Sequence, residues 1–157
     1  MSELIVVLYV KRQGQWKLAD FGLSCEGTSG SLLLTHKCNG TSGYRAPEIT
    51  QLTGYFNDKT DIWALGCILY ELAFNKKRFS CDREVWAYYS ETKNAVDIEQ
   101  PNEGFGVTGQ EIVESIRDMT SREPFSRPSA DFSPYIHRCY TNGTRDFLSE
   151  VNCNNNI

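Results

Sequence analysis

The sequence lacks the patterns that are typical of zinc-binding, nucleic-acid-binding and membrane-spanning proteins. None of its six cysteines forms a Cys-x-x-Cys pair, so the usual zinc-binding pattern is missing. A disulfide framework is possible in principle, but Cys67 falls in the most apolar segment, where a reduced and buried thiol is the ordinary state. We therefore expect an intracellular protein, located in the cytoplasm or the nucleus.

Long basic runs and long apolar runs are also missing. The longest basic run is Lys76 to Arg78 and the net charge is −4, so we expect no nucleic acid partner. The apolar run from Leu4 to Val10 is too short to cross a membrane, and we expect no membrane partner. No basic segment precedes this run and no small-residue cleavage site follows it, which favours a β-strand over a signal peptide.

The 157 residues that are present suffice for one domain with its own core. Residues 5–20 predict a hairpin, in which a strand through Val10 and a second strand from Gln15 to Ala19 flank a polar turn. Residues 23–45 are rich in Gly, Ser and Thr without a sustained period, which predicts a long loop. Residues 141–157 are polar and predict a disordered tail.

Helical patterns follow in the second half of the chain. Residues 61–74 are apolar nearly all round, so we expect a centrally buried helix with Asp61 as its N-cap. Two more helices are predicted over residues 82–91 and 110–119, and a fourth from Arg127 onward. Their apolar residues are Val85, Trp86 and Tyr89 on one side of the second helix, Ile112, Val113, Ile116 and Met119 on the third, and Phe132, Tyr135 and Ile136 on the fourth.

Four short motifs carry the functional signal. The first, Asp20-Phe21-Gly22, would alone be no more than a strand ending in a turn. The others are Gly40-Thr41-Ser42-Gly43-Tyr44-Arg45-Ala46-Pro47-Glu48, the Asp-Ile-Trp-Ala-Leu-Gly segment that starts at Asp61, and Ser126-Arg127-Pro128-Ser129. Together they resemble the activation segment and lower lobe of a eukaryotic Ser/Thr protein kinase.

The resemblance implies a mainly α fold over residues 1–140, namely a partial kinase C-terminal lobe with a short N-terminal β-hairpin. It implies ATP and Mg²⁺ as cofactors, with Asp20 as the metal ligand and Phe21 and Gly22 beside it. A protein substrate would meet the substrate loop, defined here as Gly40, Thr41, Ser42, Gly43 and Tyr44. By the same resemblance, Glu48 would form a largely buried, bidentate ion pair with Arg127, and Asp61 would anchor the backbone of the catalytic loop.

Other parts of the family's machinery do not occur in these 157 residues. The sequence has no Gly-x-Gly-x-x-Gly loop, no Val-Ala-Ile-Lys strand and no His-Arg-Asp motif. Ser2 and Val7 occupy the positions of the family's catalytic Asp and metal-binding Asn, and neither side chain can take over those roles. We therefore expect a truncated fragment of a Ser/Thr kinase domain that is inactive as this chain alone. The alternative is a degenerate lobe that acts as a protein-binding or scaffold module for a docking partner.

Overall fold

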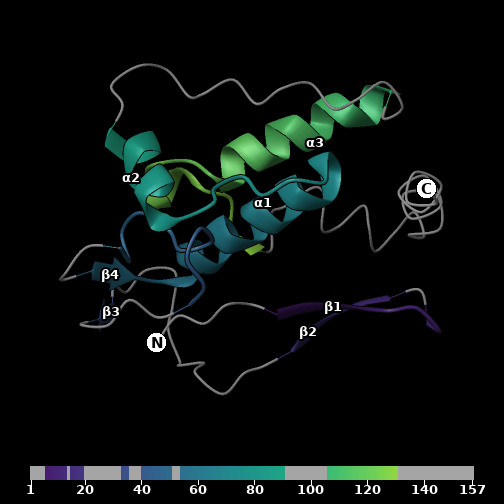
Figure 1. Cartoon of the computed structure of the whole chain (residues 1–157), viewed down its shortest axis with the longest axis horizontal. Coiled ribbons are helices and arrows are strands. Elements are labelled where there is room, and N and C mark those ends of the chain that lie inside the picture. The colour runs from purple at the N-terminus through teal and green to yellow at the C-terminus, as the bar shows by residue number, and fades with distance from the viewer. Residues whose placement is uncertain are drawn as a thin grey trace.

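The computed structural model describes residues 6–13, 15–19, 33–35, 40–50, 54–90 and 106–130, and its elements are mainly helical (Figure 1). In chain order they are β1 (Val6–Val10), β2 (Gln15–Ala19), β3 (Leu33–Thr35), β4 (Gly54–Phe56), α1 (Asp58–Phe74), α2 (Asp82–Ser90), α3 (Gly106–Met119) and the 3-10 helix η1 (Pro124–Ser126). This content agrees with the predicted partial kinase lobe. None of the helices in these ranges is long and apolar enough to span a bilayer.

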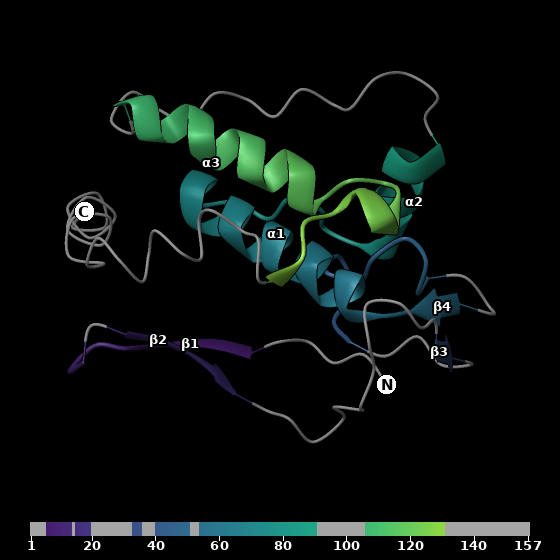
Figure 2. The same cartoon turned by 180° about the vertical axis from the view of Figure 1, so that it is seen from behind.

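The predicted N-terminal hairpin is confirmed. Strands β1 and β2 pair antiparallel, with Val6 opposite Ala19 and Val10 opposite Gln15. The N–H of Gln13 donates to the carbonyl of Val10 at 2.9 Å and closes the turn. The side chain of Leu8 is exposed, so this face of the hairpin is open to solvent. In Figures 1 and 2 the hairpin lies on the side of α1 that faces away from α3.

A second small sheet corrects the prediction of a long loop over residues 23–45, because three residues of that segment form a strand. Strand β3, inside that segment, pairs antiparallel with β4, so that Leu33 lies opposite Phe56 and Thr35 opposite Gly54. Three-residue strands are too short to show a period of two. Their pairing depends on contacts with residues far away in the sequence rather than on the local sequence. A Cβ on Gly54 would lie 2.4 Å from the carbonyl oxygen of Glu48, so only glycine fits this close backbone approach.

Helix α1 begins three residues before the predicted start, at Asp58, and its N-cap is Asn57 rather than Asp61. The backbone of Asn57 is extended and its side chain accepts a hydrogen bond from the N–H of Lys59 at 3.1 Å. Asp61 instead lies inside the first turn, where a carboxylate is favoured by the helix dipole. The prediction failed because both residue types are good caps and the sequence does not show which backbone is extended.

The core lies around α1, as predicted. Trp63 and Cys67 pack on one side of it with residues of the segment that leads into α2, while Tyr70 packs with α3 on the other. Burial raises the pKa of the Cys67 thiol to about 12, so it stays protonated. Helix α3 runs along α1 in both overall views (Figures 1 and 2). Among the described side chains of α3, the buried hydrophobic ones are the four predicted: Ile112, Val113, Ile116 and Met119.

Two other helix predictions need correction. In α2 the buried residues are Val85 and Tyr88, whereas Tyr89 is exposed and meets Trp86 edge-on at 5.7 Å. Tyr88 and Tyr89 lie three and four residues after Val85, so helical spacing alone fits both and the packing partner decides. The segment from Arg127 to Ser129 is not helical, because Pro128 favours an extended residue before it. Phe132, Tyr135, Ile136 and the predicted tail fall outside the described residues.

Candidate functional site

The substrate loop forms a turn at the edge of the helical core. The N–H of Tyr44 donates to the carbonyl of Thr41 at 3.1 Å, and the side chains of Thr41 and Ser42 are exposed. Gly40 and Gly43 both have positive φ, at 90° and 86°. Such a backbone strongly favours glycine. The structure therefore brings the five predicted loop residues together as one compact, solvent-facing turn.

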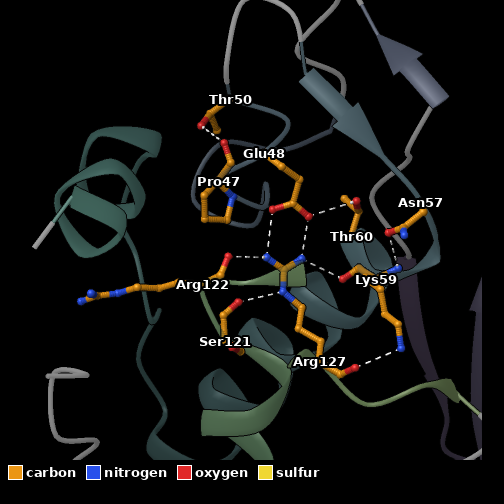
Figure 3. Close-up of polar contacts among 9 residues, drawn as sticks. All are labelled: Pro47, Glu48, Thr50, Asn57, Lys59, Thr60, Ser121, Arg122 and Arg127. Atoms are coloured by element: carbon orange, nitrogen blue, oxygen red, sulfur yellow. Dashed lines mark hydrogen bonds and ion pairs between the residues drawn. The ribbon is translucent and has the colours of Figure 1, made fainter. Parts of the chain in front are cut away.

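Glu48 lies in the turn that follows the substrate loop and pairs with Arg127, which is 79 residues further along the chain (Figure 3). The two Arg127 Nη atoms lie 2.6 and 2.9 Å from the two carboxylate oxygens of Glu48, so the predicted bidentate ion pair is present. The Arg127 side chain has no exposed surface and that of Glu48 keeps 16%. This pair joins the turn after the substrate loop to the C-terminal part of the described chain.

The rest of the Arg127 guanidinium is held by backbone carbonyls. Nε donates to Ser121 at 2.8 Å, Nη1 to Lys59 at 3.0 Å and Nη2 to Arg122 at 3.5 Å. With the two bonds to Glu48, each of the five N–H donors has an acceptor. The guanidinium also lies 5.0 Å from the ring centre of Trp63. A buried guanidinium whose hydrogen bonds are all made fixes the relative positions of the chain segments that supply the acceptors.

Two residues of α1 add to the same cluster. The Nζ of Lys59 donates to the carbonyl of Arg127 at 3.0 Å, while the carbonyl of Lys59 accepts from Arg127. The hydroxyl of Thr60 lies 3.3 Å from Glu48. Helix α1 is therefore tied through its first turn to both members of the ion pair (Figure 3).

Tyr44, the last residue of the substrate loop, is held by the last turn of α1. Its hydroxyl donates to a carboxylate oxygen of Glu71, and Lys77 lies over its ring at 5.6 Å. Burial, then this hydrogen bond to Glu71, raises the pKa of Tyr44 to about 12, so the hydroxyl remains a donor near neutral pH. Glu71 was not predicted as a site residue, although it is the polar interruption of an otherwise apolar helix.

The loop is held a third time by α2. The carboxylate of Asp82 accepts from the backbone N–H of Gly43 at 2.9 Å and from Arg45 at 2.7 Å. Arg45 also donates to the carbonyl of Gly40, which closes the loop on itself. Neither Asp82 nor Arg45 was predicted as a site residue. Arg45 lies inside a recognised motif, but nothing local to Asp82 indicates a partner 37 residues away.

Asp61 lies in the first turn of α1 and is partly buried. Burial, together with the neighbouring carboxylate of Asp58, raises its pKa to about 6. A carboxylate in this state has acceptor capacity for the backbone of another segment. The role predicted for it, as anchor of a catalytic loop, stays a prediction.

The predicted nucleotide-side residues Asp20, Phe21 and Gly22 lie outside the described residues, as does Ser2. Val7 lies in β1, opposite Leu18. Within the described ranges no group of three or more His, Cys, Asp or Glu side chains is arranged to hold a metal ion. What the described residues form is a loop with exposed side chains at Thr41 and Ser42 and three separate anchors.

Comparison with known proteins fits this arrangement. The family model "Protein kinase domain" matches residues 7–137, which include the loop and its anchors. Serine/threonine-protein kinase Nek9 of Xenopus laevis is 31% identical over 128 residues, covering 79% of this chain and 13% of that protein. A putative serine/threonine-protein kinase of Saccharomyces cerevisiae is 33% identical over 122 residues, covering 78% and 13%.

Human serine/threonine-protein kinase Nek5 is 49% identical over a shorter stretch of 63 residues, or 40% of this chain and 9% of that protein. The chain thus spans only a small part of the curated relatives that it matches. A family match over most of the chain, relatives that are Ser/Thr kinases, and a loop tied to a buried Glu–Arg pair lead to one assignment: the chain belongs to the protein kinase domain family, on its serine/threonine side.

Proposed function

We propose that this chain provides the substrate-binding part of a Ser/Thr protein kinase domain, and that its 157 residues alone do not transfer phosphate. In the family reaction, a substrate hydroxyl oxygen bonds to the γ-phosphorus of ATP, ADP leaves and a carboxylate base accepts the hydroxyl proton. The observation that carries the proposal is the substrate loop, whose exposed turn is fixed from behind by Glu48–Arg127, Tyr44–Glu71 and Arg45–Asp82.

Fixing a loop in advance serves binding, because less conformational freedom is lost when a peptide docks. The partners in the three anchors lie on α1, on α2 or close to η1, so all three contacts are made within the helical part of the described chain. Thr41 and Ser42 present hydroxyl groups at the exposed edge. These features support a surface that receives an extended protein segment.

The proposed lack of transfer follows from the sequence. Phosphoryl transfer depends on positioning and on electrostatic stabilisation of the phosphates. These residues contain neither a glycine-rich loop nor the strand lysine, and Ser2 and Val7 stand where an Asp and an Asn would be needed. By family resemblance, Asp20 would be a ligand of Mg²⁺ and Asp61 would hold the backbone of a catalytic loop. Protein kinases act on protein substrates and use Mg²⁺–ATP, and we propose both for the domain to which this chain belongs.

A second candidate is a protein-binding module that uses the same loop without any catalysis. It is favoured by the position of the three anchors, whose partners Arg127, Glu71 and Asp82 are all supplied by the helical part of the described chain. The two candidates predict the same loop geometry but differ in whether the chain acts together with a catalytic partner.

The test uses the full chain and pools of fluorescent peptides centred on Ser/Thr or on Ala. We expect the Ser/Thr pool to bind more tightly by fluorescence polarisation, and Tyr44→Phe to weaken binding because the bond to Glu71 is lost. Tyr89→Phe is the matched control, since Tyr89 is exposed on α2. Equal binding of the two pools would contradict a substrate-binding role.

The second arm measures label transferred from γ-labelled ATP to the Ser/Thr pool in the presence of Mg²⁺. We expect no transfer above that of Asp20→Ala. Transfer that Asp20→Ala abolishes would overturn the proposed inactivity. Binding without transfer that persists after addition of the missing upstream part of a kinase domain, from the glycine-rich loop through the catalytic loop, would favour the binding module.

A further inference from the structure

Asp82, the first residue of α2, was not predicted as a site residue, yet it makes several hydrogen bonds with the substrate loop and the residue after it. One carboxylate oxygen of Asp82 accepts from the N–H of Gly43 at 2.9 Å, and the other accepts from Arg45 at 2.7 Å. In the opposite direction, the backbone N–H of Asp82 donates to the hydroxyl of Ser42 at 3.1 Å. Asp82 therefore contacts two residues of the substrate loop, Ser42 and Gly43, and also Arg45 directly after it, which lie 40, 39 and 37 residues earlier in the chain.

The backbone around Gly43 explains why these contacts matter. Gly43 has a φ of +86°, and a Cβ at this position would lie 2.5 Å from the carbonyl oxygen of Phe79. The loop therefore lies directly on the segment that leads into α2. A glycine backbone has many alternative conformations of similar energy, so an external contact is needed to select one.

The charge of Asp82 is engaged as well. Burial would raise the pKa of Asp82, but the N–H of Gly43 and the guanidinium of Arg45 outweigh burial, and the pKa lies below its ordinary value. The side chains of Arg45 and Asp82 keep only 20% and 27% of their surface exposed. The pair is therefore partly shielded, unlike an ordinary surface ion pair.

We infer that Asp82 is a positioning residue of the substrate loop: it selects the conformation in which the loop receives a protein segment, without touching that segment itself. This inference rests on the proposed substrate-binding function. When the binding-competent conformation is only partly populated, the apparent affinity falls by that fraction. Loss of Asp82 then weakens peptide binding although no contact with the peptide is removed.

The variants Asp82→Ala and Asp82→Asn separate the contributions. Alanine removes both side-chain contacts, whereas asparagine keeps an oxygen for Gly43 and loses the charge that pairs with Arg45. The matched control is Glu84→Gln, because Glu84 also lies in the first turn of α2 but its carboxylate accepts only from the N–H of Ser80, at 2.6 Å. The control keeps every contact with the loop.

The first readout is residue-resolved amide hydrogen exchange. We expect the Gly43 amide to exchange about tenfold faster or more in Asp82→Ala, less so in Asp82→Asn, and at the normal rate in Glu84→Gln. Amides in α1 and α3 should keep their protection in all variants. If Asp82→Ala does not fold, Asp82→Asn decides. Unchanged exchange at Gly43, or equal acceleration throughout the helices, would overturn the inference.

The second readout is the affinity for the Ser/Thr-centred peptide pool. We expect it to fall about tenfold in Asp82→Ala and by a smaller factor in Asp82→Asn, with Glu84→Gln unchanged. Faster exchange at Gly43 with equal affinity in all variants would overturn the positioning role. If the wild-type chain binds no pool, the proposed function fails and this role fails with it, while protection of Gly43 still reports whether Asp82 holds the loop.

Discussion

Replacing Glu48 by alanine tests the buried ion pair most sharply. The change leaves the Arg127 guanidinium fully buried with its charge uncompensated, although three backbone carbonyls still accept from it. Breaking a buried pair in this way costs about 3–5 kcal/mol. Because 16% of the Glu48 side chain is exposed, water can partly replace the carboxylate, and we expect a loss near the lower limit, about 3 kcal/mol.

A loss of about 3 kcal/mol lowers the melting temperature of a chain of this size by roughly 10 °C. It also removes a large part of the total stability of a domain, which is about 5–15 kcal/mol. Urea unfolding followed by tryptophan fluorescence is a suitable assay, since Trp63 is buried and lies 5.0 Å from the Arg127 guanidinium.

The control for this experiment is Asp118→Asn, which alters an exposed carboxylate on α3 and should change stability by less than about 0.5 kcal/mol. A loss of stability below about 1 kcal/mol in Glu48→Ala would refute the reasoning, because an uncompensated buried charge destabilises a fold by more than that. The value would then match an ordinary surface pair.

Three further changes have outcomes that unfolding experiments can measure. Asn57→Ala removes the cap of α1 and should cost about 1 kcal/mol in urea unfolding; no loss would contradict the cap. Gly66→Ala would place a Cβ 2.7 Å from that of Met119 and 2.9 Å from Thr120, so we expect a loss of about 1–3 kcal/mol, whereas a gain would show that α1 and α3 are less close. The pKa of Asp61 is raised to about 6 in the folded chain, so the folded state binds the carboxyl proton more tightly than the unfolded state does. The contribution of Asp61 to the free energy of unfolding is therefore most favourable below about pH 4 and is lost as the pH rises to 6. Asp61→Asn should therefore gain about 1–2 kcal/mol relative to wild type between pH 4 and 7, after allowance for the exposed part of the side chain, and an equal pH slope in both proteins would contradict this.

The sequence predicted those parts of the fold that show in local composition or in periodic burial. The hairpin was recognised from a strand rich in Ile, Val and Tyr before a polar turn, and the apolar stripe of α3 coincides with its buried face. The start of α1 and the strands β3 and β4 could not be predicted in this way. Whether Asn57 or Asp61 caps the helix depends on one backbone angle, and three-residue strands carry no period.

Among the anchors of the substrate loop, too, some could be predicted from the sequence and others could not. The pair of Glu48 with Arg127 was predicted because both residues lie in motifs that resemble the kinase family. Asp82 lies in no motif, and its role depends on a turn 39 residues earlier that places an N–H against its carboxylate. Glu71 gave a usable signal, since a charged residue inside a buried apolar helix needs a partner.

The central claim is that the anchored loop receives protein segments centred on Ser or Thr. The most direct measurement is the equilibrium affinity of the full chain for Ser/Thr-centred and Tyr-centred peptide pools, by fluorescence polarisation. The account predicts tighter binding of the Ser/Thr pool, together with loss of that preference in Tyr44→Phe. Equal affinity for both pools, or a preference that Tyr44→Phe leaves intact, would contradict it.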